Sequence, residues 1–445
     1  MHSFANLDSL TYSVMIKHSS ILILLYFFSM FPSELPAQPD FVPNYDEGQV
    51  PNYTLPDPLV FKNGVEVKGE LEWQQRRAEI LQFFSSQVYG VTPSPPLNTK
   101  SKVLSTDNDA LSGKATRKEI RLFLTNKKTR PYIDILLFTP NQATRPVPAF
   151  LGLNFYGNHT VHTAPNITLS DQWMRANEDF GIVNHRATES SRGVRASRWP
   201  IEMIIDRGYA LATVYCGDID PDKNDFQDGV HPLFYQSGQS MPESNEWGTI
   251  GAWAWGLSRA ADHLQQEEAI NDNQIAVIGH SRLGKAALWA GAQDARFALV
   301  ISNNSGCGGA ALSKRAYGET VGRINHSFPH WFCNNFEQYN KNEAGLPVDQ
   351  HQLLALIAPR PLYVASAEED QWADPRGEFL SAVHATPVYK LLGKEGLPVS
   401  EMPEIDQPVM GTIGYHIRHG GHDINAYDWQ QYLDFADKHF GSSAP

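Results

Sequence analysis

Hydrophobic residues along the chain fall into two patterns, short apolar runs and longer stretches with helical spacing. Residues 120–124 alternate between apolar and polar positions, which predicts a half-buried strand, and residues 132–138 become continuously apolar, which is typical of a central strand. Further strands are predicted at residues 147–155, 209–215, 275–279, 299–302 and 362–366. An early meander followed by alternating strands and helices predicts an α/β fold with a mostly parallel central sheet and helices on both faces, a three-layer sandwich.

Helical spacing is clearest in two segments. The apolar positions of residues 71–84 predict an amphipathic helix that ends near Gly90, and those of residues 250–264 predict a second helix. Two other segments lack periodicity. Residues 38–68 are rich in Pro, Asp and Asn and are expected to form an extended surface arm. Residues 160–199 carry five arginines and are interpreted as a long loop or insertion, so that residues 38–445 form a single domain.

Composition narrows the class of protein. Of 445 residues, 42% are hydrophobic and 19% are charged, which excludes a mainly disordered chain. The formal charge of −13 argues against a nucleic-acid binder, because phosphate contacts need a basic surface. Beyond the N-terminus no apolar run reaches the roughly 18 residues of a membrane span, so no membrane association is expected. We expect a monomer.

The N-terminus has the pattern of a secretion signal. The apolar run at residues 21–28 follows Lys17 and precedes the small residue Ala37. This pattern predicts a signal over residues 1–37 and a secreted or periplasmic mature protein. Met1 and Met15 both remain candidate start sites, and a buried N-terminal helix is the alternative interpretation.

The segment Gly279–Lys285 carries the sharpest chemical signal. It follows an apolar strand and opens a helix, with Ser281 where a strand-to-helix turn would expose a hydroxyl above the sheet. This is the nucleophile turn of α/β-hydrolases, except that the second glycine, Gly284, comes one position late, giving G-x-S-x-x-G. An ordinary turn with Ser281 as helix N-cap is the alternative.

A nucleophilic serine needs a base and an orienting acid, which follow it in α/β-hydrolases in the order acid, then histidine. Residues 368–374, just past a late strand, supply carboxylates. His422 follows two glycines, which would let a loop bring its imidazole over Ser281. The expected order is present.

Three other clusters of residues have partial patterns of ligand-binding sites. His416, His419 and His422 could suggest zinc, but the glycines between them argue against a fixed site. Residues 218–222 resemble the start of a calcium loop without its later ligands, and are interpreted as a solvated loop. Residues 306–309 lack a nucleotide-binding pattern. We expect no metal and no cofactor.

Several blocks in the same order extend the pattern beyond one serine motif. They lie at residues 154–160, 279–285, 305–311, 372–375 and 414–418. With these blocks the chain resembles the glucuronoyl esterases, carbohydrate esterase family 15, over most of its length. The resemblance implies an α/β-hydrolase fold and a serine esterase that cleaves, through an acyl-enzyme on Ser281, the ester between 4-O-methyl-glucuronic acid of xylan and lignin alcohols. The implied partner is a glucuronoxylan or lignin-carbohydrate ester.

The resemblance also implies residue roles. By matching position Ser281 is the nucleophile, His422 the base, and Arg282 the oxyanion support. Lys285, Glu319 and Trp372 match positions that hold the uronic acid. The alternatives are structural, with Arg282 and Glu319 in ion pairs, Lys285 solvated and Trp372 in the core.

The chain departs from many family members in its acid. The matching glutamate position is Asn304, which cannot carry a negative charge. Asp370 is therefore the predicted triad acid, with Glu369 and Asp374 as competitors.

A second departure concerns cysteines. Fungal members join the residues before the serine and after the histidine by a disulfide, but His280 and Asp423 stand there, which favours the bacterial-type branch. Cys307 and Cys333 could pair in an exported protein, leaving Cys216 free, although three buried thiols are at least as compatible with the sequence.

Two other functions stay open. The same triad could serve an acetyl or feruloyl esterase on plant polysaccharide. A carbohydrate-binding protein without enzyme activity is the third hypothesis, against which the order of the triad residues argues.

Overall fold

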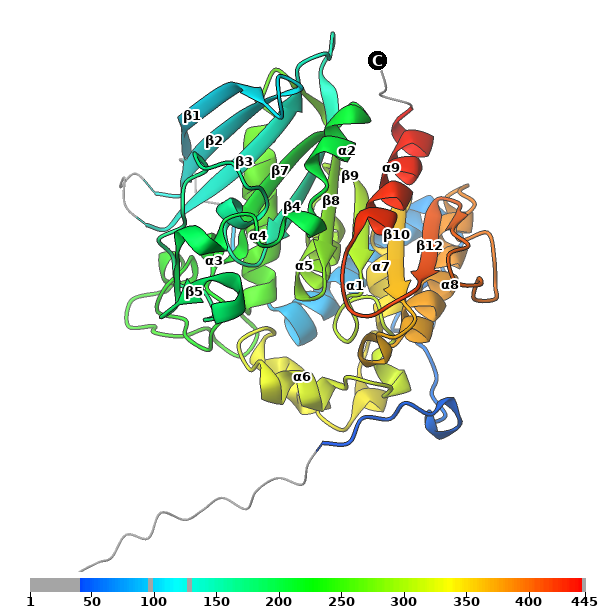
Figure 1. Cartoon of the computed structure of the whole chain (residues 1–445). Helices are drawn as coiled ribbons and strands as arrows, with labels where there is room; N and C mark the ends of the chain where they lie inside the picture. Colours follow the sequence, from blue (N-terminus) through cyan, green and yellow to red (C-terminus); the bar gives the residue numbers. More distant parts are fainter. Residues whose placement is uncertain (1–40, 95–98, 126–129, 442–445) are drawn as a thin grey trace, which may run out of the picture. The chain divides into compact units, whose positions relative to one another are not determined.

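A single large β-sheet organises the described part of the chain, which in this computed structural model comprises residues 41–94, 99–125 and 130–441. Its strands are β1 (Lys100–Ala110), β2 (Ala115–Phe123), β3 (Tyr132–Pro140), β4 (Val147–Asn154), β7 (Ala210–Tyr215), β8 (Ile270–His280), β9 (Phe297–Asn303), β10 (Leu362–Ala367), β11 (Val409–Met410) and β12 (Ile413–Arg418). Within these ranges they pair as one ten-stranded sheet in the order β1-β2-β3-β7-β4-β8-β9-β10-β12-β11 (Figure 1).

The sheet has an antiparallel and a parallel part. Each strand pairs antiparallel with its neighbour along the series β1, β2, β3 and β7. From β7 onward, through β4, β8, β9 and β10 to β12, neighbouring strands pair parallel. Along β8 the side chains alternate between two cores, with Ile275 and Val277 on one face and Ala276 and Ile278 on the other. Continuous apolar runs therefore mark strands buried on both faces, as the sequence predicted.

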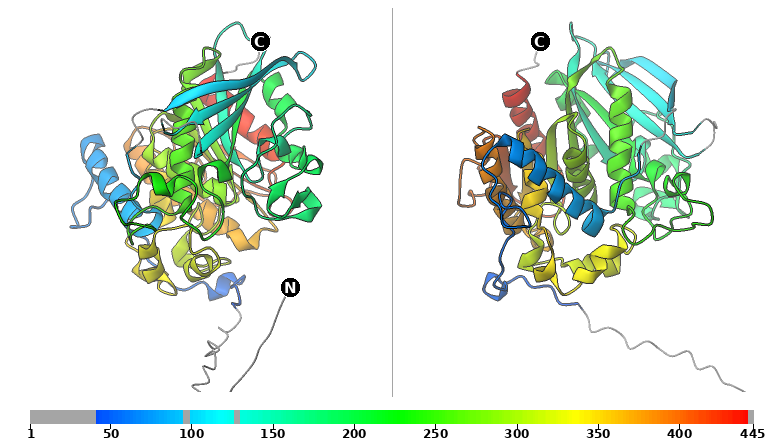
Figure 2. Two further views of the ribbon diagram at one scale, coloured as in Figure 1. Left: turned by 90° about the vertical axis from the view of Figure 1, so that its left-hand side faces the viewer. Right: turned by 180° about the vertical axis from the view of Figure 1, so that it is seen from behind.

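Helices cover both faces of the sheet. They are α1 (Glu70–Phe84), α2 (Ile201–Asp206), α3 (Cys216–Ile219), α4 (Thr249–Leu264), α5 (Arg282–Gln293), α6 (Val321–Ser327), α7 (Gln350–Ala355), α8 (Pro375–Leu391) and α9 (Ala426–Phe440). Helices α1, α4, α5, α7 and α8 pack into the core on one face, and α2 and α9 into the core on the other (Figures 1 and 2). The predicted three-layer α/β-hydrolase architecture is confirmed.

The helix predicted to end near Gly90 does so. After α1 the chain makes one wider helical turn from Ser85 to Tyr89 and leaves it at Gly90, whose φ is 86°. A Cβ atom there would lie 2.2 Å from the backbone oxygen of Glu246, so only glycine fits.

The region of residues 160–199 is irregular, as expected. It contains short 3₁₀ turns and a two-stranded ribbon of β5 (Ile182–Val183) and β6 (Arg186–Ala187). Its Arg198 forms an ion pair of 2.5 Å with Asp423, in the loop after β12. Residues 160–199 therefore touch the carboxyl end of the parallel strands.

At the N-terminus, residues 42–68 form an arm with few regular elements. The described residues do not include the predicted signal over residues 1–37, either candidate start site, or residues 38–40 of the arm. Strand β12 was not among the predicted strands. In the described ranges, none of the helices has the length and apolar content that crossing a bilayer would require.

Candidate active site

Ser281 lies on a sharp turn between β8 and α5. Its backbone has φ 58° and ψ −133°, a strained conformation for a residue with a side chain. A Cβ atom at Gly279 would lie 2.0 Å from the backbone oxygen of Leu283, so the turn requires glycine at that position. The Ser281 N–H donates to the backbone oxygen of Asn303 at the end of β9, at 2.9 Å. This geometry holds the Ser281 hydroxyl above the carboxyl edge of the sheet.

Three residues far apart in the sequence meet at this hydroxyl. The Oγ of Ser281 is 2.8 Å from Nε2 of His422, which comes from the loop between β12 and α9. The Nδ1 of His422 is 2.6 Å from Oδ2 of Asp370, in the turn after β10. Because the carboxylate accepts from Nδ1, Nε2 carries the free lone pair and can accept the serine proton.

The three candidate acids are in different environments. Asp370 is buried and contacts His422, whereas Asp374 forms an ion pair with Arg315 at 2.8 Å and caps the start of α8. Glu369 is exposed. Of these three carboxylates, only Asp370 is brought to the histidine. The Nδ2 of Asn304 donates to the same Asp370 oxygen at 2.8 Å, so Asn304 braces the acid.

Arg282 is the first residue of α5, where a backbone N–H has no acceptor within the helix. Its guanidinium carbon lies 4.5 Å from the ring centre of Phe155 and 5.9 Å from that of Trp331. Its Nε lies 3.1 Å from Oδ2 of Asp222. Arg282 follows Ser281 directly in the chain, and its side chain is one-fifth exposed, so the cation held by these contacts remains accessible.

Asp222 corrects one expectation from the sequence. The sequence predicts a solvated loop at residues 218–222, but Asp218, Asp220 and Asp222 are all buried. Asp222 accepts hydrogen bonds from His330 at 3.0 Å and Trp331 at 2.8 Å. Burial alone would raise the pKa of Asp222, but the charge of Arg282 and these hydrogen bonds outweigh it and hold the pKa well below its usual range.

A signal for Asp222 was present in the sequence. It follows the predicted strand at residues 209–215, and carboxyl ends of parallel strands meet at the edge that carries Ser281.

Lys285, Glu319 and Trp372 come together near the nucleophile. Lys285, one helical turn after Ser281, is buried, and its Nζ donates to the backbone oxygen of Ser305, so the solvated-lysine alternative is wrong. Burial lowers the pKa of Lys285, and the nearby Glu319 opposes that shift. Burial raises the pKa of Glu319, against the effects of Lys285 and of a hydrogen bond from Trp372. The cluster presents one cation, one carboxyl and one half-buried indole.

The three histidines weighed as zinc ligands have separate partners. His416 is buried and donates to Asp428 at 2.9 Å, His419 pairs with Glu368 at 2.5 Å, and His422 faces Asp370. In the part of the chain that the structure describes, no group of three His, Cys, Asp or Glu side chains is arranged to hold a metal ion.

Comparisons with known proteins agree with this site. The family model described as "Glucuronyl esterase, fungi" matches residues 196–393. "Carbohydrate esterase MZ0003" from an unknown prokaryotic organism is 51% identical over 405 residues, covering 90% of this chain and 93% of that protein. A solved structure of a promiscuous CE15 esterase from a marine bacterial metagenome has a TM-score of 0.85 and 51% identity, covering 89% of this chain and 100% of that one.

The chain belongs to carbohydrate esterase family 15. A 4-O-methyl-glucuronoyl methylesterase 1 from Wolfiporia cocos (strain MD-104) is more distant, 29% identical over 376 residues, covering 80% of this chain and 75% of that protein. The higher identity to the prokaryotic and bacterial proteins agrees with the bacterial-type branch of the family.

The departures from fungal members are visible in the structure. His280 donates from Nδ1 to Oδ1 of Asn303 at 2.6 Å, and Asp423 pairs with Arg198, so polar contacts occupy both positions of the fungal disulfide. All three cysteines, Cys216, Cys307 and Cys333, are free and buried. The pairing of Cys307 with Cys333 is therefore wrong, and the alternative of three buried thiols is confirmed.

Proposed function

We propose that this family 15 enzyme hydrolyses the ester that joins 4-O-methyl-glucuronic acid of xylan to lignin alcohols. The observation that carries the proposal is the contact chain Ser281–His422–Asp370, with distances of 2.8 Å and 2.6 Å. Arg282, the residue after Ser281, adds an accessible guanidinium. Family membership supports the choice of substrate, because relatives across the family are named for glucuronoyl esters.

The reaction follows from the positions of the atoms. Ser281 Oγ attacks the ester carbonyl while His422 Nε2 takes its proton, and Asp370 stabilises the imidazolium that forms. The carbonyl oxygen becomes negative, and the backbone N–H and guanidinium of Arg282 are the donors that would stabilise it. His422 then gives the proton to the leaving alcohol. Water, deprotonated by His422, attacks the acyl carbonyl, and His422 returns that proton to Ser281 Oγ as the uronic acid leaves.

Lys285, Glu319 and Trp372 are the proposed uronate-binding residues. The amine and carboxyl can donate to and accept from sugar hydroxyls, and the indole offers an apolar face to the ring. These groups keep the acyl part of the substrate fixed while the alcohol leaves. We further propose a single catalytic domain over residues 38–445, exported by the signal at residues 1–37 and active as a monomer.

A second candidate has one observation in its favour. The 51% identical protein of known structure is described as a promiscuous esterase. An acetyl or feruloyl ester on plant polysaccharide is therefore the competing substrate, handled by the same triad.

A matched pair of variants tests the proposal. Purified protein is assayed on methyl, allyl and benzyl glucuronate beside 4-nitrophenyl acetate and feruloylated xylan. We expect the glucuronate esters to give the highest kcat/KM, and Ser281→Ala to lower kcat by at least about 10⁴-fold. Ser381→Ala, which removes a buried hydroxyl from α8, serves as the control and should keep full activity.

Each part of the proposal can fail separately. Retained turnover in Ser281→Ala would contradict the triad. Inert glucuronate esters beside fast acetate or ferulate release would replace the proposed substrate by the second candidate. Binding of aldouronic acids without turnover of any ester would favour a carbohydrate-binding protein.

A further inference from the structure

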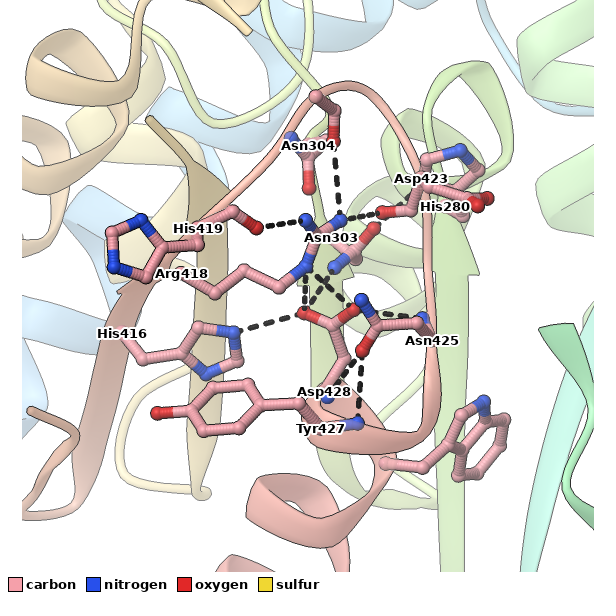
Figure 3. A network of polar contacts seen from close by, with 12 residues as sticks. His280, Asn303, Asn304, His416, Arg418, His419, Asp423, Asn425, Tyr427 and Asp428 are labelled. Carbon is pink, nitrogen blue, oxygen red and sulfur yellow. Dashed lines mark hydrogen bonds and ion pairs between the residues drawn. The ribbon is translucent and has the colours of Figure 1, made fainter. Parts of the chain in front are cut away.

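The loop that carries His422 is held from below by one buried guanidinium (Figure 3). Arg418, the last residue of β12, donates from Nη1 to the backbone oxygen of His419 at 2.8 Å. Its Nη2 donates to the backbone oxygens of Gly421 at 3.2 Å and Asp423 at 2.5 Å. The two latter residues flank His422 directly, so one side chain fixes the backbone on both sides of the base.

Arg418 is itself fixed by a fully buried carboxylate. Asp428, in the first turn of α9, accepts from Arg418 Nε at 2.9 Å. The same carboxylate accepts from His416 Nε2 at 2.9 Å, from Asn303 Nδ2 at 3.2 Å and from the backbone N–H of Asn425 at 2.8 Å. Four donors from three structural elements thus hold Asp428, and through it Arg418, in one position.

The network also reaches the nucleophile. The side chain of Asn303 accepts from His280, whose ring centre lies 4.7 Å from that of His422, and the backbone oxygen of Asn303 accepts from the Ser281 N–H. Burial has the largest effect on His280, and the charges of His422 and Arg198 add to it, so the pKa of His280 lies well below its usual range. A neutral imidazole therefore packs beside His422. Asp428 is therefore connected to the supports of both Ser281 and His422.

Stability alone does not explain such a pair. Burying two charges costs solvation energy, and apolar residues of similar size often stabilise a fold equally well. Proton transfer, by contrast, needs the base held to within about 0.5 Å of its working position. The His422 side chain is 42% exposed and stands beside two glycines, so its own packing cannot supply that precision.

We propose that Arg418, held by Asp428, is a positioning residue that sets the His422 imidazole between Ser281 and Asp370. The inference rests on the proposed triad but not on the identity of the ester. According to this proposal, the buried Arg418–Asp428 ion pair contributes to the catalytic rate by fixing the loop that carries His422.

Arg360 provides a matched control within the same chain. Its guanidinium also donates to three backbone oxygens, those of Asp294 at 3.1 Å, Phe297 at 2.7 Å and Gly291 at 2.5 Å. These contacts lie at the amino ends of β9 and β10, the edge of the sheet opposite Ser281. Arg418→Lys and Arg360→Lys therefore remove similar guanidinium contacts at opposite edges of the sheet.

The test compares the two variants in the full chain by kcat, KM, Tm and the downfield proton resonance of the His422–Asp370 hydrogen bond. We expect Arg418→Lys to lower kcat by about 10–10²-fold, the usual cost of a displacement near 1 Å, with KM within twofold and the downfield resonance shifted or lost. Arg360→Lys should lower Tm comparably while keeping kcat within threefold and the resonance unchanged. Equal kcat losses in both variants, or an unchanged kcat in Arg418→Lys, would overturn the proposal.

Two further arms keep the result decisive. If Arg418→Lys does not fold, Asp428→Asn takes its place with the same outcomes, and failure of both to fold beside a folded Arg360→Lys assigns the pair to stability alone. If wild-type protein hydrolyses no glucuronate ester, the proposed function fails, and Arg418 is then tested with 4-nitrophenyl acetate, which needs the same triad.

Discussion

The residues on the two sides of Ser281 differ in how they are held in place by hydrogen bonds. On the base side, His422 and Asp370 lie within a dense hydrogen-bond network, in which one oxygen of Asp370 accepts from both His422 and Asn304. On the oxyanion side, Arg282 Nε and Asp222 Oδ2 lie 3.1 Å apart, yet neither atom has a hydrogen-bond partner among the described residues. For the proposed mechanism the base side is already in its working geometry, whereas Arg282 Nε and Asp222 Oδ2, on the proposed oxyanion side, retain unused hydrogen-bonding capacity.

This difference matches what each side must do. A base works when its lone pair is fixed at one distance from the hydroxyl, so the hydrogen bonds that hold His422 and Asp370 are an advantage. An oxyanion donor accelerates the reaction only if it interacts more strongly with the transition state than with the ground state. A guanidinium that is held by charge and by aromatic faces, rather than by saturated hydrogen bonds, remains able to do so.

The largest loss of kcat is expected from a substitution on the side of Ser281 that carries His422 and Asp370. Asp370→Asn should lower kcat by about 10³–10⁴-fold, because the amide no longer stabilises the imidazolium and allows the wrong tautomer of His422. Steady-state kinetics on the best ester measure the loss. Glu369→Gln, one residue earlier and exposed, is the control, and a comparable loss in that variant would show that the acid has been assigned to the wrong residue.

A smaller loss is expected on the oxyanion side. Arg282→Met should lower kcat by about 10²–10³-fold with a smaller change in KM, because the cation contributes mainly when the carbonyl oxygen becomes negative. Asp222→Asn keeps Arg282 but removes its ion pair, and should cost about tenfold. Arg376→Met, which removes an exposed guanidinium on α8, controls for loss of positive charge. The interpretation fails if Asp222→Asn is as damaging as Arg282→Met.

The smallest effect concerns stability and its dependence on pH. Burial raises the pKa of Glu378 to about 8, and its carboxyl contacts Ser366 and the backbone N–H groups of Ser305 and Gly306. Between the usual value of 4.5 and about 8, the folded protein holds one proton more at Glu378 than the unfolded chain does. The free energy of unfolding should therefore fall as pH rises from 5 to 8, by at most about 1.4 kcal/mol per pH unit.

Glu378→Gln removes this titration while keeping the shape of the side chain. Calorimetry should show a smaller decrease in Tm between pH 5 and pH 8 in the variant than in the wild type. Glu369→Gln, exposed to solvent, should leave the wild-type slope unchanged. Parallel curves for wild type and Glu378→Gln would mean that Glu378 ionises normally in the fold.

The sequence allowed prediction of features that have a local cause. The apolar run at residues 275–279 predicted the interior of β8, and the glycines around Ser281 predicted the turn, because sterics at that position leave few alternatives. The order serine, acid, histidine along the chain predicted that His422 and a carboxylate of residues 368–374 would complete the triad. The choice of Asp370 over its two neighbours needed the three-dimensional contacts.

Features with distant causes could not be predicted. Strand β12 contains His416 and Arg418, buried polar residues that both pair with Asp428, on another element. The buried state of Asp222 depends on His330, which is 108 residues away in the chain. Strand β1 was missed for the opposite reason, since its mostly exposed residues carry no apolar pattern.

The shared carboxylate of Asp428 has a consequence for recombining this enzyme with its relatives. The same side chain closes the N-terminal capping box of α9 and anchors the arginine beneath the base. A chimera whose crossover falls between Arg418 and Asp428 would separate two side chains that hydrogen-bond to each other. Crossover points placed before Ile413 keep β12, the loop that carries His422 and α9 together in one exchanged segment.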